Sequence, residues 1–370
     1  MPLVGRLVIS LASVILGLLV ILAITIYAIT YHPKTVENVG YVCPADTPSL
    51  TSGQSIKVLS YNVQYFAGKD YVFYYDLDND AGPDTRPSAA AIEQTVTSIG
   101  QLILSEDPDI LLLQELHDGA KATDYQNQTA LLLSKLNAHY PCYSEAFYWK
   151  ADFVPHPAIM GSVGMKLLTL SKYKIEAASR HQLSLIGSDP VTQAFNLKRA
   201  ILATRLPVTA NESHNGGEGQ KRKSKFVAMN THLDAFSQGT NTMEKQVSEV
   251  GQLLSDTAHP WLIGGDFNLL APHQFNSLAQ SQQNLYQPTS EIAALTDRYA
   301  SVPSMKNINS EDKANWYTHY PNDPRVLGPD RSIDYIFYDR SLTLVDSKVM
   351  HGVTHKFSDH LPLVATYQLP

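Results

Sequence analysis

The stretch WLIGGDFNLL, from Trp261 to Leu270, decides the fold of this chain. Its apolar start is typical of a buried strand, yet the run stops at two glycines and is followed by Asp266 and Asn268. Residues two apart on a strand share a face, so we expect these two side chains to point into one cleft if extended geometry continues. The glycines are expected to let the backbone pass close to that cleft.

Polar residues also end other apolar runs of the chain. A single such residue marks only where a strand leaves the core, whereas several carboxylates, amides and imidazoles at strand ends indicate one shared site. In α/β proteins, sites gather where strand ends and their loops converge. The residues in this position are Asn62, Glu115, Asn230, His232, Asp334, Asp359 and His360.

The composition is that of a globular protein without a basic excess. The chain has 370 residues, of which 44% are hydrophobic and 17% charged, enough for one domain of roughly 300 residues or two smaller ones. Its net charge of −7 excludes a protein that binds nucleic acid by overall charge alone. A locally basic cleft is still compatible with this composition.

Residues 7–31 contain no charged residue and predict a transmembrane anchor. A helix of that length reaches roughly 37 Å, enough to cross a bilayer core of about 30 Å. A cleaved signal peptide is the alternative, although its apolar region is usually shorter. Arg6 precedes the span, whereas Lys34 and Glu37 follow it, which favours a single-pass protein with its domain on the extracytoplasmic side.

Residues 32–55 are rich in Pro, Ser and Gly and predict a linker between the membrane and a domain that occupies 56–370. Cys43 and Cys142 fit an oxidising compartment if they pair. Two free buried thiols would give the same sequence, so the pairing stays open at this stage.

Strands and helices alternate through the domain. Apolar residues from Ile92 to Ile103 recur at helical spacing, with Ser88 as the expected cap. Further helices are expected to start near Asp124 and to cover Thr242–Ser255. Because many strands accompany few helices, we expect a layered α/β domain built on sandwiched sheets. The expected strands lie at 56–63, 109–115, 162–170, 175–183, 199–206, 225–233, 332–339 and 361–369.

Two loops carry unusual charge. The segment 211–225 ends in basic residues that can touch phosphates or anionic headgroups, or form a solvated loop without a partner. The segment 76–84 spaces its aspartates as oxygen ligands of a structural Ca²⁺ ion are spaced, but lacks a glutamate at the twelfth position. A plain acidic turn is the alternative. The four aspartates concerned are Asp76, Asp78, Asp80 and Asp84.

Six motifs in order give the chain a family resemblance. From about residue 56 to residue 370 it resembles the endonuclease/exonuclease/phosphatase superfamily, which has the DNase-I-like fold. The resemblance implies an α/β, four-layer sandwich of two mostly antiparallel sheets flanked by helices, here with an N-terminal transmembrane helix. The motifs are LSYNVQYF (59–66), DILLLQE (109–115), NTHLD (230–234), GGDFN (264–268), SIDYIF (332–337) and SDHLPLVATY (358–367).

The resemblance also implies roles for the residues at strand ends. Asn62 and Glu115 would hold a divalent metal, Mg²⁺ or Mn²⁺, with Asp359 near it. His232 and Asn268 would contact the phosphate, and Asp266 would orient or activate the attacking water. Asp334 would orient His360 as the partner in acid and base catalysis.

The chemistry of phosphodiester hydrolysis makes the same demands. Negative charge grows on the non-bridging oxygens, so the site needs a cation and hydrogen-bond donors. Magnesium prefers oxygen ligands and keeps several waters, so one or two carboxylates and an amide suffice. A water must lose a proton near neutral pH, which suits a histidine paired with a carboxylate.

The sequence therefore predicts a membrane-anchored, metal-dependent phosphodiesterase that uses in-line water attack. Its substrate is a nucleic acid or a phospholipid or sphingolipid headgroup, and the bilayer itself is a partner through the N-terminal helix. Two alternatives stay open: an inositol-phosphate-type phosphomonoesterase, and a non-catalytic surface binding module on a hydrolase scaffold. The binding module is disfavoured because the main motif positions keep their chemical groups.

Overall fold

The computed structural model describes residues 3–69, 71–73, 76–77, 81–84, 86–136, 138–210, 224–235 and 240–370. Asp78 and Asp80 of the acidic segment lie outside the described residues, as does 211–223 of the basic loop. Lys225, at the end of that loop, forms an ion pair with Glu176 at 2.6 Å.

Two sheets form the centre of the domain. The first has the order β1 (Val36–Asn38), β8 (Ala177–Gln182), β9 (Ala200–Thr209), β10 (Ser224–His232), β11 (Trp261–Asp266), β13 (Asp334–Tyr338) and β12 (Ala300–Val302), with β3 (Leu50–Thr51) paired to β9. The second has the order β14 (Thr343–Val349), β15 (Leu363–Gln368), β4 (Ser55–Asn62), β5 (Ile110–His117), β7 (Gly161–Ser171), β6 (Cys142–Val154) and β2 (Tyr41–Val42). Most pairs are antiparallel; β4 with β5, β10 with β11 and β3 with β9 are parallel.

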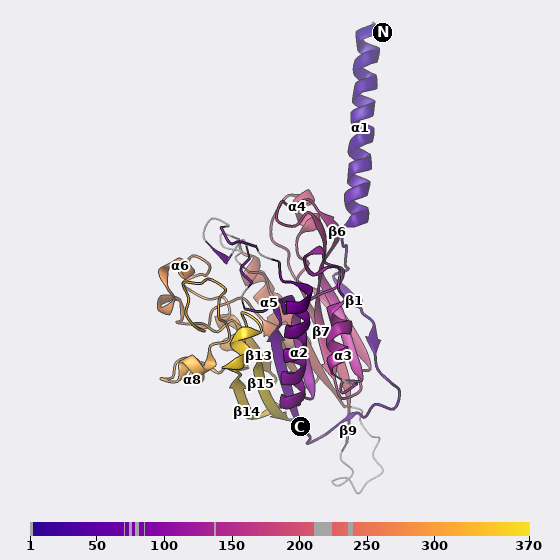
Figure 1. The fold of residues 1–370 in the computed structure, drawn as a ribbon. Coiled ribbons are helices and arrows are strands. Elements are labelled where there is room, and N and C mark those ends of the chain that lie inside the picture. Colours follow the sequence, from indigo (N-terminus) through magenta and orange to yellow (C-terminus); the bar gives the residue numbers. More distant parts are fainter. Residues whose placement is uncertain are drawn as a thin grey trace.

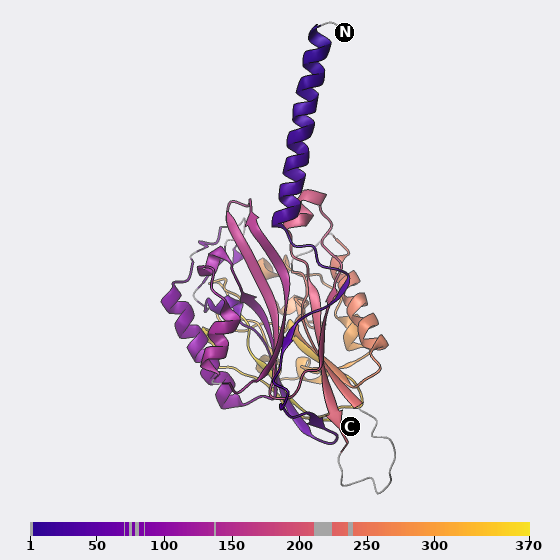
Figure 2. The same ribbon diagram turned by 90° about the vertical axis from the view of Figure 1, so that its right-hand side faces the viewer.

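Helices cover the outer faces of both sheets, so the domain has four layers (Figures 1 and 2). Helices α2 (Ala89–Glu106) and α3 (Gln128–Lys135) pack on the sheet that contains β4 and β5. Helices α5 (Thr242–Asp256) and α7 (Ala293–Thr296) pack on the other sheet. A third apolar cluster fills the space between the sheets. The expected four-layer α/β sandwich is confirmed. The remaining helices are α1 (Leu3–Ile29), α4 (Pro190–Phe195), α6 (Gln280–Gln283) and α8 (Met305–Ile308).

Local signals placed some elements better than others. Ser88 caps α2 by accepting a hydrogen bond from the backbone of Ala91, as expected. Helix α3 was expected to start near Asp124 but begins at Gln128, with Asn127 as its cap. Asp124 instead ends a short turn in a left-handed conformation, with φ of 52°, which a helix cannot continue from. Strand β6, at Cys142–Val154, was not expected from the sequence, which predicted no strand between 115 and 162.

The segment 32–55 is held against the domain at several points. Strands β1 and β2 form edges of the two sheets, and β3 pairs with the last residues of β9. A disulfide joins Cys43 to Cys142 at the start of β6, across a separation of 99 residues. Helix α1 extends away from the domain beside α4 and the far end of β6 (Figure 1).

The two glycines of the opening stretch control how closely β11 packs. A Cβ on Gly264 would lie 2.8 Å from Leu112 Cδ1 in the opposite sheet, so Gly264 lets the two sheets approach each other. A Cβ on Gly265 would lie only 1.9 Å from the backbone oxygen of Thr231 on the neighbouring strand. Only glycine fits there without displacing backbone.

We expect Gly265→Ala to lower the free energy of unfolding by about 3 kcal/mol or to prevent folding, because backbone of β10 must move to admit the methyl group. The measurement is the midpoint of thermal unfolding, followed by circular dichroism of the full chain in detergent. Gly328→Ala is the matched control, since a Cβ at Gly328 meets no atom within 4 Å. Equal midpoints for both variants would contradict this account of β11.

Candidate active site

Strands from both sheets end together at one end of the domain. In one sheet the parallel strands β4 and β5 end at Asn62 and His117, and in the other the parallel strands β10 and β11 end at His232 and Asp266. Asp266 pairs in register with His232 on one side and with Asp334 on the other. A polar cluster therefore closes the end of the apolar core between the sheets.

Asp266 is the centre of this cluster and is 1% exposed. Its Oδ1 accepts a hydrogen bond from the backbone nitrogen of Asn268 at 2.8 Å. Its Oδ2 lies 3.0 Å from Asn62 Nδ2, 3.3 Å from His232 Nε2 and 3.4 Å from His360 Nε2. Burial raises the pKa of the Asp266 carboxyl to about 6, against the opposing effect of the charge on His360. This carboxyl is thus suited to exchange a proton near neutral pH.

His360 is held by Asp334. Its Nδ1 lies 2.9 and 3.1 Å from the two carboxylate oxygens of Asp334, whose backbone nitrogen donates to Thr318 Oγ1. Burial alone would lower the pKa of His360, but the carboxylates of Asp334, Asp266 and Asp359 outweigh it and raise that pKa well above its ordinary value. The surrounding carboxylates therefore favour the protonated, cationic form of His360.

His232 lies in the same cluster, but there the surroundings favour its neutral form. Burial, followed by the charges of Arg199 and His360, lowers the pKa of His232 well below its ordinary value. The neutral ring has its Nδ1 3.2 Å from the hydroxyl of Tyr148. Arg199 forms an ion pair with Asp234 at 3.1 Å and lies over the Tyr148 ring. It therefore holds in place the tyrosine that contacts His232.

Glu115 reaches the cluster through a β-bulge. The register of β5 against β7 shifts between Leu113 and Leu116, and Glu115 has a φ of 63°. Regular alternation would turn Glu115 away from the face that Gln114 occupies, and the bulge turns it back. Glu115 Oε1 accepts a hydrogen bond from Asn62 Nδ2 at 3.0 Å. Burial, followed by the charge of Asp359, raises the pKa of the Glu115 carboxyl to about 7.

Two amides are oriented differently from the sequence-based expectation. Asn62 presents its nitrogen to Glu115 and Asp266, while its oxygen accepts from the backbone of Gln64 at 3.0 Å. Asn268 has a φ of 54°, so extended geometry ends at Asp266 and does not bring Asn268 to the same face by alternation. Its side chain instead donates to the backbone oxygen of Leu233 at 3.1 Å.

Asn230 lies deeper than expected. It faces the same side of β10 as His232 but is fully buried, and it bridges the two sheets. Its Nδ2 donates to the backbone oxygens of Leu113 and Leu168 at 2.9 and 3.0 Å, and its Oδ1 accepts from Gln114 Nε2 at 2.7 Å. The expectation that Asn230 points into the cleft beside His232 is wrong, because alternation predicts a face but not a depth.

The acidic segment reaches the edge of the site. Asn322 Nδ2 lies 3.4 Å from a carboxylate oxygen of Asp359 and 3.3 Å from one of Asp76. Burial, followed by the charge of Asp359, raises the pKa of Asp76 to about 7. Asp84 accepts instead from the hydroxyl of Tyr71 at 3.1 Å. The two described aspartates of the calcium hypothesis thus have different partners, and that hypothesis stays a prediction.

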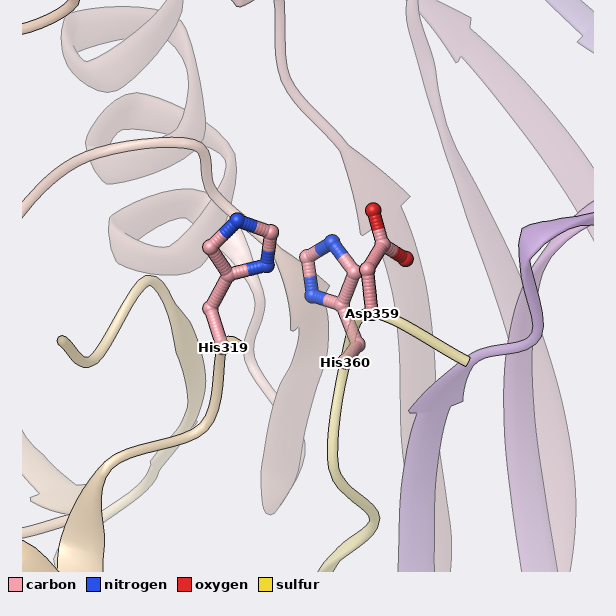
Figure 3. Close-up of side chains that lie close together, drawn as sticks. All are labelled: His319, Asp359 and His360. Carbon is pink, nitrogen blue, oxygen red and sulfur yellow. The ribbon is translucent and has the colours of Figure 1, made fainter. Parts of the chain in front are cut away.

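Sequence reasoning missed His319. Its ring lies beside that of His360, with centroids 4.6 Å apart, and Asp359 is also close (Figure 3). Burial and the neighbouring charge of His360 lower the pKa of His319 well below its ordinary value, so the ring is neutral. Among the described residues, no hydrogen-bond partner meets its Nδ1. His319 lies in a loop before β13, where no strand or helix periodicity marks it.

The donors of the cluster fit a divalent cation. The carboxylates of Glu115, Asp266 and Asp359 lie close enough to influence one another, and carboxylate oxygens are the ligands that Mg²⁺ prefers. A cation among them would remove their mutual repulsion. Three groups of described residues bring donor atoms within 4.8 Å of one another: Glu115, His232 and Asp266; Asp266, Asp334 and His360; and His319, Asp359 and His360.

Comparison with known proteins identifies the fold. Residues 59–360 match the Endonuclease/Exonuclease/phosphatase family. The crystal structure of an endonuclease/exonuclease/phosphatase from Beutenbergia cavernae is similar with a TM-score of 0.54 and 19% identity, over 85% of this chain and 72% of that one. The catalytic domain of human Nocturnin with bound sulfate is similar with a TM-score of 0.49 and 20% identity, over 89% of this chain and 96% of that domain.

A curated relative matches over a shorter stretch. A UPF0294 protein of Yersinia enterocolitica is 28% identical over 143 residues, which are 39% of this chain. The match spans 43% of the length of that relative.

We expect Asp334→Asn to lower the pKa of His360, because the variant removes one of the carboxylates that oppose the effect of burial. The measurement is the chemical shift of the His360 ring against pH in metal-free protein. The control is Asp330→Asn, which removes a carboxylate that pairs with Arg331. An unchanged titration in Asp334→Asn would show that Asp334 does not set the charge of His360.

Proposed function

Because the chain belongs to the endonuclease/exonuclease/phosphatase family of metal-dependent phosphoester hydrolases, we propose that it is a membrane-anchored phosphodiesterase. The observation that carries the proposal is the convergence of the Asn62 amide and the His232 and His360 imidazoles on the carboxylate of Asp266. A cationic His360 and a neutral His232 beside one carboxyl give the acid, the base and the donor that ester hydrolysis needs.

Glu115 and Asp359 would hold the divalent cation, which supplies Lewis-acid neutralisation of the phosphate when bound. Asn62 gives its nitrogen to two carboxylates, so we propose that it positions Glu115 and Asp266 and assign it no ligand oxygen. This differs from the ligand role that the resemblance implies.

The remaining residues divide the proton transfers. Asp266 accepts a proton from the water whose oxygen attacks phosphorus in line with the leaving group. The P–O ester bond breaks, and His360 gives its Nε2 proton to the leaving oxygen. Asp334 fixes the orientation of His360 through Nδ1. His232 donates a hydrogen bond to the non-bridging oxygens, where negative charge grows. Asn268 donates the second hydrogen of its side-chain nitrogen, while the first stays on the backbone oxygen of Leu233.

Helix α1 supports membrane anchoring. The stretch Leu7–Ile29 is a 23-residue helix with a mean hydropathy of 3.1, long and apolar enough to span a membrane, and the domain buries none of its most apolar part. Such a surface is stable in a bilayer and unfavourable in water. The disulfide between Cys43 and Cys142 supports an extracytoplasmic domain, because disulfides persist in oxidising compartments.

A substrate screen tests the reaction class. We expect the purified full chain with Mg²⁺ to hydrolyse phosphodiesters and a chelator to abolish turnover, since the carboxylates then repel the phosphate. The substrates are DNA, RNA, phospholipid and sphingolipid vesicles, and inositol phosphates as the phosphomonoester comparison. Hydrolysis of inositol phosphates alone, or full turnover in the presence of chelator, would contradict the proposal.

Two substitutions test the assigned roles. We expect Asp266→Asn and His360→Ala each to lower kcat by about 10²–10⁴-fold, the usual contribution of a general base or acid. The measurement is steady-state hydrolysis after circular dichroism has shown retained folding. His259→Ala, at the opposite end of β11, is the control and should keep full activity. Undiminished turnover in both site variants would refute the assignment.

A further inference from the structure

The hairpin between β6 and β7 ends in an apolar tip, FVPHPAIM, from Phe153 to Met160. His156 is its only ionisable residue. The side chains of Phe153 and Met160 are 40% and 50% exposed, and all but Val154 and Ile159 of the tip are exposed. A cluster of exposed apolar side chains on a projecting tip is typical of a surface that binds a membrane or another protein.

The tip lies beside the end of α1. Thr30, just after α1, forms an isolated antiparallel bridge with Ala151 of β6, and the ring of Tyr31 contacts that of Phe147. Helix α1 also contacts α4, where Val191 is 54% exposed. Figures 1 and 2 show α1 leaving the domain at the end where the β6–β7 hairpin and α4 lie.

The register of the strands places the tip at the depth of a membrane interface. The apolar span of α1 ends at Ile29, so Thr30 marks the level of the bilayer surface. Ala151 is at that level, and β6 continues three residues to Val154 before the turn, which adds roughly 10 Å. Groups that bind at membrane interfaces bury their apolar faces about 5–10 Å deep.

The same register places the active site close below. On β7, Val163 pairs with Ala151 of β6, and Lys166 pairs with Leu116 of β5. Leu116 is next to Glu115, so the tip side and the site side of β7 are three residues apart. Three residues correspond to roughly 10 Å along the strands, and β7 separates β5 from β6 by two strand spacings, again roughly 10 Å. Strands β5 and β6 run in the same direction, so the site and the tip are at the same end of the sheet.

We propose that the apolar tip, together with Val191, inserts into the bilayer interface beside α1 and holds the active-site end against the headgroups, so that the substrate is a phosphodiester of a lipid in that bilayer. The inference rests on the proposed function and names its substrate class. A nucleic acid would have to enter the narrow space between the active-site end and the bilayer from solvent. A lipid headgroup is already there.

A fluorescence measurement tests the insertion. The two native cysteines are joined in a disulfide, so Met160→Cys can be labelled with an environment-sensitive fluorophore in the full chain. In vesicles of equal parts phosphatidylcholine and phosphatidylglycerol, nitroxide-labelled lipid should quench this label. The control is Val345→Cys on β14, which is 61% exposed and near the opposite end of the domain. Equal quenching of both labels, or none of either, overturns the insertion.

Activity measurements test the substrate class. The double variant Phe153→Asp and Met160→Asp should hydrolyse the lipids of those vesicles about tenfold more slowly or worse, since it loses the apolar burial of two side chains. Its hydrolysis of soluble bis(para-nitrophenyl) phosphate should equal that of wild type. Unchanged vesicle hydrolysis in the variant, or a wild type that cleaves DNA but no vesicle lipid, overturns this inference. A wild type inactive on the soluble ester as well as on every lipid and nucleic acid refutes the proposed function instead.

Discussion

The close approach of the two sheets at Gly264 is the constraint on which the rest of the structure depends. Any side chain there would meet Leu112 of the opposite sheet. Because the sheets lie so close, Asn230 can bridge them deep in the core, and Asn62 from one sheet can reach Asp266 of the other at 3.0 Å. The active site lies at the end of the interface between the two sheets, where hydrogen-bonded polar side chains replace the apolar contacts of the core.

The polar residues at strand ends predicted which side chains gather here, and the resemblance implied that Asp334 would orient His360. Strand alternation predicted less, because the backbone leaves extended geometry after Asp266 and turns Asn268 elsewhere. Glu115 was expected from its place at a strand end, but alternation could not predict the face on which it lies, because a bulge with φ of 63° reverses that face. Alternation also could not separate Asn230 from His232, since both lie on one face and differ only in depth.

Local sequence patterns also could not predict strand β6, the disulfide or the position of His319. Strand β6 alternates buried and half-buried residues, with bulges that interrupt the period, and it was not expected as a strand. The pairing of Cys43 with Cys142 depends on a fold that brings residues 99 positions apart together. His319 lies beside His360 in a loop that pairs with Arg331, so its position in the site depends on tertiary structure alone.

The charge of the site links its cation to its substrate. Glu115, Asp266 and Asp359 would repel an anionic phosphate, and of the nearby cations Lys69 already donates to the backbone oxygen of Pro321 at 2.7 Å. In the proposed mechanism a phosphodiester would gain electrostatic stabilisation from the ion that Glu115 and Asp359 would hold and from the protonated form of His360 beside it. Since the cation would relieve the repulsion between the carboxylates and the phosphate, and the phosphate would in turn attract the cation, their binding free energies would be coupled, and the coupling is reciprocal. Under the proposed function, the acidic character of the site would follow from the use of a metal ion to recognise an anion.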